Sequence, residues 1–329
     1  MNQLFLGQTS IWFSSSILDL LHNWDPILGP LLQPLSVLCQ NLGGSVFFLG
    51  LISFFYVYIR PKLAFELALA LLTSGFLGSI AKFYLESPRP FPYPEAYDEK
   101  AFGLPSGHVY SSFVVWGLLA YRIPKLWLRI LSISIILIMP FSRMYLRLHY
   151  LGDVTLGFLL GAIHLTIIII LLKRIDKINL SHYFIQSEKY RTLTLLGIVI
   201  TLSPIALDSP FLSVEHFHSL SIALMSSGSL AGFWIGILFY PRFSKPKFLS
   251  WSLKFENHSD FWKTFAMRTI VLAIIMILFY AIPGMIVKGS IWKDDLLIRY
   301  FRYMLVSFAL VLIFPILIQK IANGRYLLD

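Results

Sequence analysis

Two histidines and one carboxylate stand out in this largely apolar chain because their types and spacing suit nucleophilic catalysis. His149 and Asp153 are four residues apart, so one turn of helix would bring the imidazole and the carboxylate together. A carboxylate held beside one ring nitrogen keeps that nitrogen protonated and leaves the other free to attack an electrophile. His108 would then serve as the general acid that protonates a leaving oxygen.

Basic residues near these positions indicate what the electrophile is. Lys82, Arg89 and Arg143 provide three fixed positive charges, which predicts an oxyanion with more than one negative charge. Ser106 and Gly107 occupy the expected entry of a helix, where free backbone N–H groups and the helix dipole favour an anion. Glycine also lets the backbone approach that anion closely. Together these residues predict phosphoryl transfer in two steps, in which a phosphohistidine forms and is then hydrolysed.

We expect no metal ion and no other cofactor at this site. The sequence contains neither a HExxH pattern nor a cluster of carboxylates that would hold a metal ion. The three cations and the backbone N–H groups would instead stabilise the charge on the transferring phosphoryl group. The single cysteine, Cys39, excludes an internal disulfide and a cysteine-based metal site.

The composition indicates which elements position these residues. Of the 329 residues, 57% are apolar and only 13% are charged, whereas a soluble globular domain is about a quarter charged. Aromatic residues make up 16% of the chain, which argues against disorder. We therefore expect an all-α fold, a polytopic integral membrane helix bundle in a lipid bilayer. The net charge of +10 fits basic loops that fix topology and requires no nucleic acid. Nothing in the sequence predicts an oligomeric state.

Apolar runs separated by charged, proline or glycine breaks predict about nine transmembrane helices. They cover residues 43–59, 63–84, 108–122, 126–142, 153–172, 192–207, 217–240, 267–287 and 300–319. Three parts follow: an interfacial N-terminal segment (1–42), a phosphatase core bundle that carries the site residues (43–175) and extra C-terminal helices (176–329). Pro26, Pro30 and Pro34 favour one or two interfacial helices for the first part, and the alternative is a first spanning helix kinked by proline.

Charge placement predicts the orientation of the bundle. With the N-terminus outside and the C-terminus cytoplasmic, most of the 27 Lys and Arg residues fall in cytoplasmic segments. The segments around Lys82, His108 and His149 then all lie on the outer side. We therefore expect one active site at the membrane surface, facing the periplasm, the cell exterior or a lumen.

Three spaced motifs carry a resemblance to a known family. Lys82-x6-Arg89-Pro, Pro-Ser-Gly-His108 and Ser-Arg143-x5-His149-x3-Asp153 together resemble the signature of the type 2 phosphatidic acid phosphatase superfamily. The resemblance covers roughly residues 43–175. It implies phosphate binding by Lys82, Arg89, Ser106, Gly107 and Arg143, with His108 as general acid and base, His149 as nucleophile and Asp153 as its partner.

The resemblance leaves the substrate open. A lipid phosphate or lipid diphosphate is the leading interpretation, because the site is at bilayer level and no soluble substrate domain is visible. The nine-span count favours, as an alternative, a glucose-6-phosphatase-like hydrolase of a soluble sugar phosphate. Phosphate transfer to another acceptor and a non-enzymatic oxyanion transporter are further alternatives. Arg147 departs from the family pattern, because a small residue, often glycine, is frequent at that position.

Several other polar residues are better explained by structure than by chemistry. Glu86 is expected to pair with Lys82 or Arg89, and His164 to be a buried histidine with its hydrogen bonds satisfied. His216 and His218 are weak candidates for a metal site, since no third ligand is evident.

Overall fold

A computed structural model describes residues 11–23, 25–90, 100–175, 188–243 and 258–321, and in these residues every regular element is a helix. The expected all-α fold is confirmed. In chain order the helices are η2 (Ile11–Phe13), α1 (Ser16–His22), α2 (Asp25–Leu42), α3 (Ser45–Phe54), η3 (Phe55–Ile59), α4 (Pro61–Leu85), α5 (Gly107–Arg122), α6 (Leu126–Tyr145), α7 (Leu151–Ile175), α9 (Glu188–Leu202), η4 (Ser203–Leu207), α10 (Val214–Phe243), α11 (His258–Met276), η5 (Ile277–Ala281), α12 (Ile282–Lys288), α13 (Leu296–Phe308), η6 (Ala309–Ile313) and α14 (Phe314–Ile321).

The expected count of nine membrane spans is not confirmed. Within the described residues, six helical segments are long and apolar enough to cross a bilayer, or seven if one bent pair counts as a span. All nine expected segments are helical, but α5 has only 16 residues and α9 only 15. A straight helix needs about 20 residues to cross the hydrocarbon core, so these two fall short by themselves.

The bent pair lies in the N-terminal part of the chain. Helix α2 continues through Pro30 and Pro34. Together with α3 and η3 it is long and apolar enough to cross a bilayer, but the two halves meet at an angle of 55°. Proline is tolerated in membrane helices because neighbouring groups satisfy the freed carbonyls. By length and composition this pair is a broken span or a re-entrant segment. An interfacial position stays a prediction for α1, whose 7 residues are too few to cross a bilayer.

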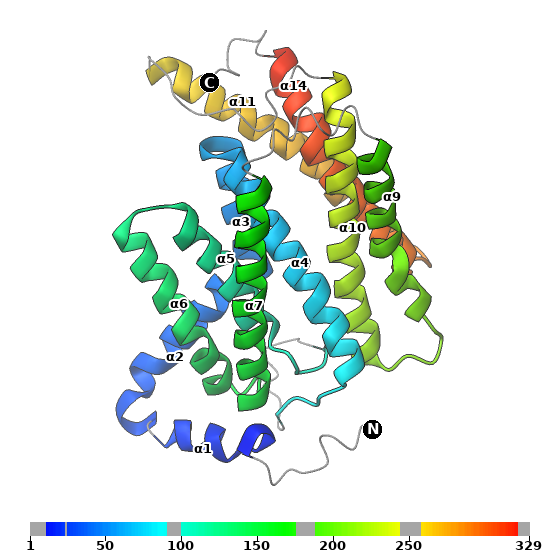
Figure 1. Cartoon of the computed structure of the whole chain (residues 1–329). Coiled ribbons are helices and arrows are strands. Elements are labelled where there is room, and N and C mark those ends of the chain that lie inside the picture. The colour runs from blue at the N-terminus through cyan, green and yellow to red at the C-terminus, as the bar shows by residue number, and fades with distance from the viewer. Residues whose placement is uncertain (1–10, 24, 91–99, 176–187, 244–257, 322–329) are drawn as a thin grey trace. The chain divides into compact units, whose positions relative to one another are not determined.

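The chain divides into two compact units, and all the expected site residues fall in the first. Unit 1 comprises Met1–Gly50, Thr73–Leu172 and Ser209–Ala223. Within it α6 packs against both α2 and α5, and α1 contacts α2 and α6 (Figure 1). The boundary expected near residue 175 falls beside residues 176–187, which lie outside the described residues.

Glycines on α7 bring it close to α5. A Cβ added at Gly161 would lie 2.6 Å from Cβ of Phe113, and one at Gly157 would lie 2.8 Å from the Ser106 carbonyl oxygen. Small residues four apart let membrane helices approach in this way, since lipid offers no hydrophobic drive for their association. The Gly157–Ser106 contact therefore sets the start of α5 directly against the first turns of α7.

Unit 2 comprises Leu51–Leu72, Lys173–Asp208 and Leu224–Asp329 and holds three five-residue π-helices, η3, η5 and η6. Arg268 is fully buried here, and its Nη1 donates to the Val57 carbonyl of η3 at 2.8 Å. Gly228 and Gly232 of α10 face backbone atoms of Tyr300 and Met304 on α13. This unit is thus a tightly packed bundle, with a buried arginine bonded to a carbonyl of a π-helix.

Candidate active site

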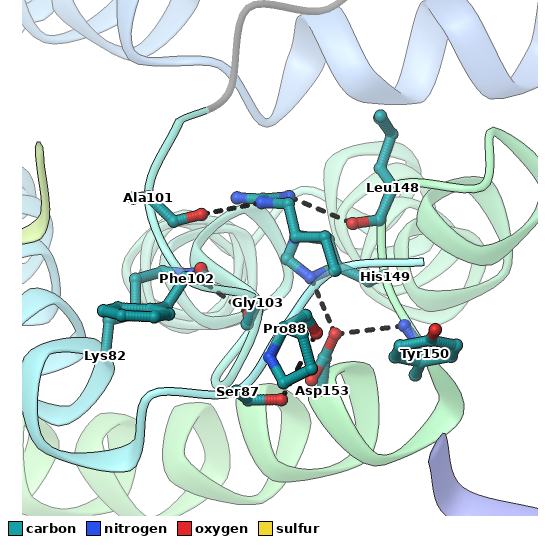
Figure 2. Close-up of polar contacts among 11 residues, drawn as sticks. Lys82, Ser87, Pro88, Ala101, Phe102, Gly103, Leu148, His149, Tyr150 and Asp153 are labelled. Atoms are coloured by element: carbon teal, nitrogen blue, oxygen red, sulfur yellow. Dashed lines mark hydrogen bonds and ion pairs between the residues drawn. The ribbon is translucent and has the colours of Figure 1, made fainter. Parts of the chain in front are cut away.

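His149 and Asp153 meet at the start of α7. His149 Nδ1 lies 3.2 Å from Asp153 Oδ2, and the side chains are 1% and 0% exposed (Figure 2). The expected helical turn is absent at His149, which lies in the loop before α7. The backbone N–H of Tyr150 donates to the same Oδ2 at 3.0 Å, so Asp153 also caps the helix as the acidic residue of a capping box does.

Arg89 holds the opposite edge of the imidazole. Its Nη1 is 3.3 Å from His149 Nε2 and donates to the Leu148 carbonyl at 3.0 Å, while its Nε donates to the Ala101 carbonyl at 2.7 Å. A guanidinium can only donate, so His149 Nε2 faces it with a lone pair. The hydrogen-bond partners thus assign the proton to Nδ1, beside Asp153, and the lone pair to Nε2.

Lys82 and Arg143 complete the set of cations. Lys82 ends α4, is 6% exposed, and donates from Nζ to the Phe102 carbonyl and, at 3.0 Å, to the Gly103 carbonyl. Arg143, in the last turn of α6, is fully buried. Buried charges are retained where they bind something, so both are candidates for holding an anion.

The environment of His149 favours a neutral ring. Burial lowers the pKa of this imidazole well below its ordinary value, and the positive charges of Arg89, Arg143, Lys82 and His108 lower it further. A neutral imidazole with its lone pair on Nε2 is the form that can attack phosphorus. The same result places His108 within electrostatic reach of His149.

Ser106 and Gly107 form the entrance to α5. Ser106 precedes the helix without capping it through its side chain, and its buried Oγ has no hydrogen-bond partner among the described residues. The Ser106 N–H donates to the Asp153 carbonyl at 3.0 Å, which joins the entrance to α7. A Cβ added at Gly107 would meet nothing within 4 Å. This helix start therefore presents a hydroxyl and open space of the kind an anion would occupy.

Comparison with known proteins gives a family for the part of the chain that carries these residues. A family model described as the PAP2 superfamily matches residues 63–177. Residues 63–177 belong to the PAP2 superfamily. The expected family, and with it the expected class of enzyme, a membrane phosphatase, are thereby confirmed.

Two similar proteins overlap the PAP2 domain. An undecaprenyl-diphosphatase of Sulfolobus acidocaldarius is 27% identical over 171 residues, which cover 49% of this chain and 79% of the relative. The crystal structure of Aquifex aeolicus LpxE is 24% identical, with a TM-score of 0.37, and the match covers 46% of this chain and 93% of that one.

The structure adds one residue to the PAP2 site that the sequence did not reveal. Gly103 donates to the Ser87 carbonyl at 2.8 Å, and a Cβ at Gly103 would lie 2.8 Å from Asp153 Oδ2. Only glycine lets this loop pass the carboxylate while its own carbonyl accepts from Lys82. The sequence offered one indication of this role, because Gly103 stands two residues before the Pro-Ser-Gly-His motif.

Three polar residues that are not among the expected site residues have structural partners. Glu86 contacts His216 Nε2 at 3.1 Å, so the expected pairing with Lys82 or Arg89 was wrong. His164 is satisfied as expected, by Thr73 Oγ1 at 3.1 Å and the Tyr110 hydroxyl at 2.9 Å. In the part of the chain that the structure describes, no group of three or more His, Cys, Asp or Glu residues could hold a metal ion, so His216 and His218 gain no third ligand.

Gly107→Ala provides a direct test of the anion site in the PAP2 domain. The added methyl meets no protein atom, so we expect the fold to persist while the methyl occupies space that the phosphoryl group needs. We expect kcat/KM to fall about 10²-fold, comparable to losing one oxyanion donor. Gly50→Ala, which also meets nothing within 4 Å, is the matched control and should leave activity unchanged. Full activity of Gly107→Ala would contradict an anion site at this helix start.

Proposed function

We propose that this protein is an integral membrane phosphatase that removes phosphate from a lipid phosphate or lipid diphosphate through a phosphohistidine on His149. The observation that carries the proposal is the orientation of His149, whose Nδ1 faces a buried carboxylate while Nε2 faces Arg89. A carboxylate beside Nδ1 and a lone pair on Nε2 are the two features that a histidine nucleophile needs.

The proposed reaction proceeds in two balanced steps. In the first, the Nε2 lone pair of His149 attacks phosphorus, the bond from phosphorus to the leaving oxygen breaks, and His108 gives that oxygen its proton. In the second, His108 takes a proton from water, the water oxygen attacks phosphorus, and the P–N bond breaks to release phosphate. Asp153 stabilises the positive charge that develops on the ring in each step.

The charged residues of the site have a defined part in this reaction. Lys82, Arg89 and Arg143 neutralise the equatorial oxygens, and the Ser106 hydroxyl and the Gly107 N–H add hydrogen bonds to them. Arg89 is already fixed by two backbone carbonyls, so little reorganisation is needed when phosphate enters. A dianion with three anchored cations therefore needs no metal ion to offset its charge.

Two observations support a lipid as the substrate. Lys82, Arg143 and Asp153 lie at the ends of α4, α6 and α7, which are all long and apolar enough to cross a membrane, so the phosphate would be presented at bilayer level. The similar protein from Sulfolobus acidocaldarius is named an undecaprenyl-diphosphatase, and its match spans most of that protein. A lipid diphosphate is the corresponding substrate class for this chain.

A substrate panel tests the proposed function. Purified protein in detergent with EDTA should release inorganic phosphate from a polyprenyl diphosphate or phosphatidic acid, with kcat/KM at least about tenfold above that for glucose 6-phosphate. Vanadate should inhibit, because its trigonal bipyramidal adduct with His149 imitates the transition state. Preference for glucose 6-phosphate would favour the sugar phosphatase alternative, and no phosphate release from any substrate would refute the proposal.

We further propose that the site faces the extracytoplasmic side, with the N-terminus outside and the C-terminus in the cytoplasm. After Cys39 is replaced by Ala, a Lys100→Cys variant should react with an impermeant thiol reagent in intact cells. A Lys125→Cys variant should react only after lysis. Both lysines are exposed, so accessibility within the protein does not distinguish them. The reverse labelling pattern would place catalysis on the cytoplasmic face.

A further inference from the structure

The N-terminal segment formed by η2 and α1 lies against the loop that carries His149. The ring of Phe13 packs edge-on against the ring of Tyr150, with centroids 6.3 Å apart. A Cβ at Gly152 would lie 2.7 Å from Cζ of Phe13 and 3.1 Å from the Trp12 carbonyl oxygen, so the segment fills the space beside this glycine. Contacts thus reach Tyr150, the last residue of the loop, and Gly152 in the first turn of α7.

A further contact reaches the loop two residues before His149. Arg147 Nη2 donates to Asp19 Oδ1 of α1 at 2.7 Å. Arg147 follows the end of α6 with φ 54°, and the N–H groups of Arg147 and Leu148 bond the carbonyls of Met144 and Arg143, as in a Schellman motif. Glycine is favoured at this left-handed position, and the arginine that stands there instead reaches α1 with its side chain.

The contacted loop is part of the catalytic geometry rather than a support for it. The Tyr150 N–H and His149 Nδ1 share one oxygen of Asp153, and the Leu148 carbonyl accepts from Arg89. A shift of the backbone on either side of His149 would therefore change the direction of its lone pair. Misplacing a reacting group by about 1 Å can lower a rate about 10²-fold.

We infer that the segment Ile11–His22 is a positioning platform for the nucleophile, and that Phe13 is its principal positioning residue. This inference rests on the proposed function of His149 as nucleophile. Arg147 and Asp19 are secondary, because their side chains are 30% and 58% exposed and exposed ion pairs contribute little. Phe13 packs against the loop directly and has no such competition from water.

A positioning role predicts a change in pH dependence that loss of stability alone would not produce. Lys82, Arg89, Arg143 and His108 place positive charge around His149, and Asp153 faces its Nδ1. Burial is the largest cause that lowers the pKa of His149, so a loosened loop that admits water should raise it. The nucleophile must be neutral. The acidic limb of the pH profile, where kcat/KM falls at low pH, should therefore move to higher pH.

The test compares Phe13→Ala with Ile11→Ala, a control in the same segment whose side chain is 58% exposed. Phe13→Ala should lower kcat about tenfold with KM nearly unchanged. It should also shift the acidic limb of the kcat/KM–pH profile to higher pH by about half a unit. Ile11→Ala should change neither quantity. Gly152→Ala should be impaired alone, but should add less loss in the Phe13→Ala background, because the shortened side chain removes the 2.7 Å contact and leaves only the 3.1 Å approach to the Trp12 carbonyl oxygen.

An activity-independent measurement separates this inference from the proposed function. Hydrogen exchange of residues 146–153 should accelerate in Phe13→Ala, while exchange in α6 stays as in the wild type. If the wild type hydrolyses phosphate and Phe13→Ala matches it in kcat, acidic limb and exchange, the platform is refuted and the function stands. If the wild type hydrolyses no phosphate, the function fails, and the exchange data alone decide whether the segment orders the loop. Equal losses in Ile11→Ala would also overturn the inference.

Discussion

His149→Ala is expected to reduce phosphate release by on the order of 10⁴-fold or more, as loss of a nucleophile does elsewhere. The imidazole is buried between Asp153 and Arg89, and its removal takes away the lone pair that the proposed first step uses. Asp153→Asn should approach the same loss. An amide can offer its NH₂ group to Nδ1, which would turn the lone pair of the ring away from the phosphate.

The decisive measurement for His149→Ala is the phosphoenzyme. Wild-type protein quenched in alkali after brief exposure to ³²P-labelled substrate should carry an acid-labile phosphoryl group, and the variant should carry none. His218→Gln is a matched control, because His218 lies outside the three motifs and its Nδ1 bonds the Val214 carbonyl in its own helix. Phosphate release by His149→Ala at the wild-type rate would disprove the nucleophile assignment.

The convergence of the site residues could be predicted from the sequence because it depends on spacing and topology. Placing the three motifs at helix ends on one side of a bundle is enough to bring Lys82, Arg89 and His149 into one site, and the structure joins their segments by hydrogen bonds. The i, i+4 spacing likewise predicted the His149–Asp153 contact, although the imidazole precedes the helix instead of lying on it. Their chemical roles stay predictions.

Contacts between distant segments could not be predicted in this way. Nothing in the pattern around Phe13 indicates that its ring fills the space beside Gly152, since that contact depends on where α1 lies in the fold. Arg268 could be counted as a cytoplasmic charge from the sequence, yet it is fully buried and bonded to a carbonyl of a π-helix. Hydropathy registers neither π-helices nor the 55° bend between α2 and α3. In the described residues six helical segments, or seven with the bent pair, are long and apolar enough to cross a bilayer, so the expected nine spans are not confirmed.

Arg147 shows how a departure from a family pattern can be explained once the backbone is known. From the sequence it was only an arginine where glycine is frequent. The left-handed φ of 54° accounts for the preference for glycine, and the arginine side chain bonds Asp19 of α1. Neither the dihedral angle nor the partner, more than a hundred residues away, leaves a local signal in the sequence.

His108→Ala is expected to separate the two steps of the reaction. His108 is the second residue of α5, next to Gly107, and when protonated it lowers the pKa of His149, so we expect it to exchange protons at the attacked phosphorus. With a good leaving group such as p-nitrophenol the first step needs little acid assistance, so His149 should still be phosphorylated. The second step needs a base to activate water, and its rate should fall about 10²- to 10⁴-fold.

The variant should therefore accumulate phosphoenzyme. A rapid-quench time course with p-nitrophenyl phosphate should show a burst of p-nitrophenol equal to the enzyme concentration, followed by very slow turnover. Acid-labile phosphate on the protein should reach the same level. His108→Ala combined with His149→Ala should lose both the burst and the label, which ties the trapped group to His149. Slow turnover without a burst or label would mean that His108 is needed before phosphorus is attacked, and the proposed division of labour between the two histidines would be wrong.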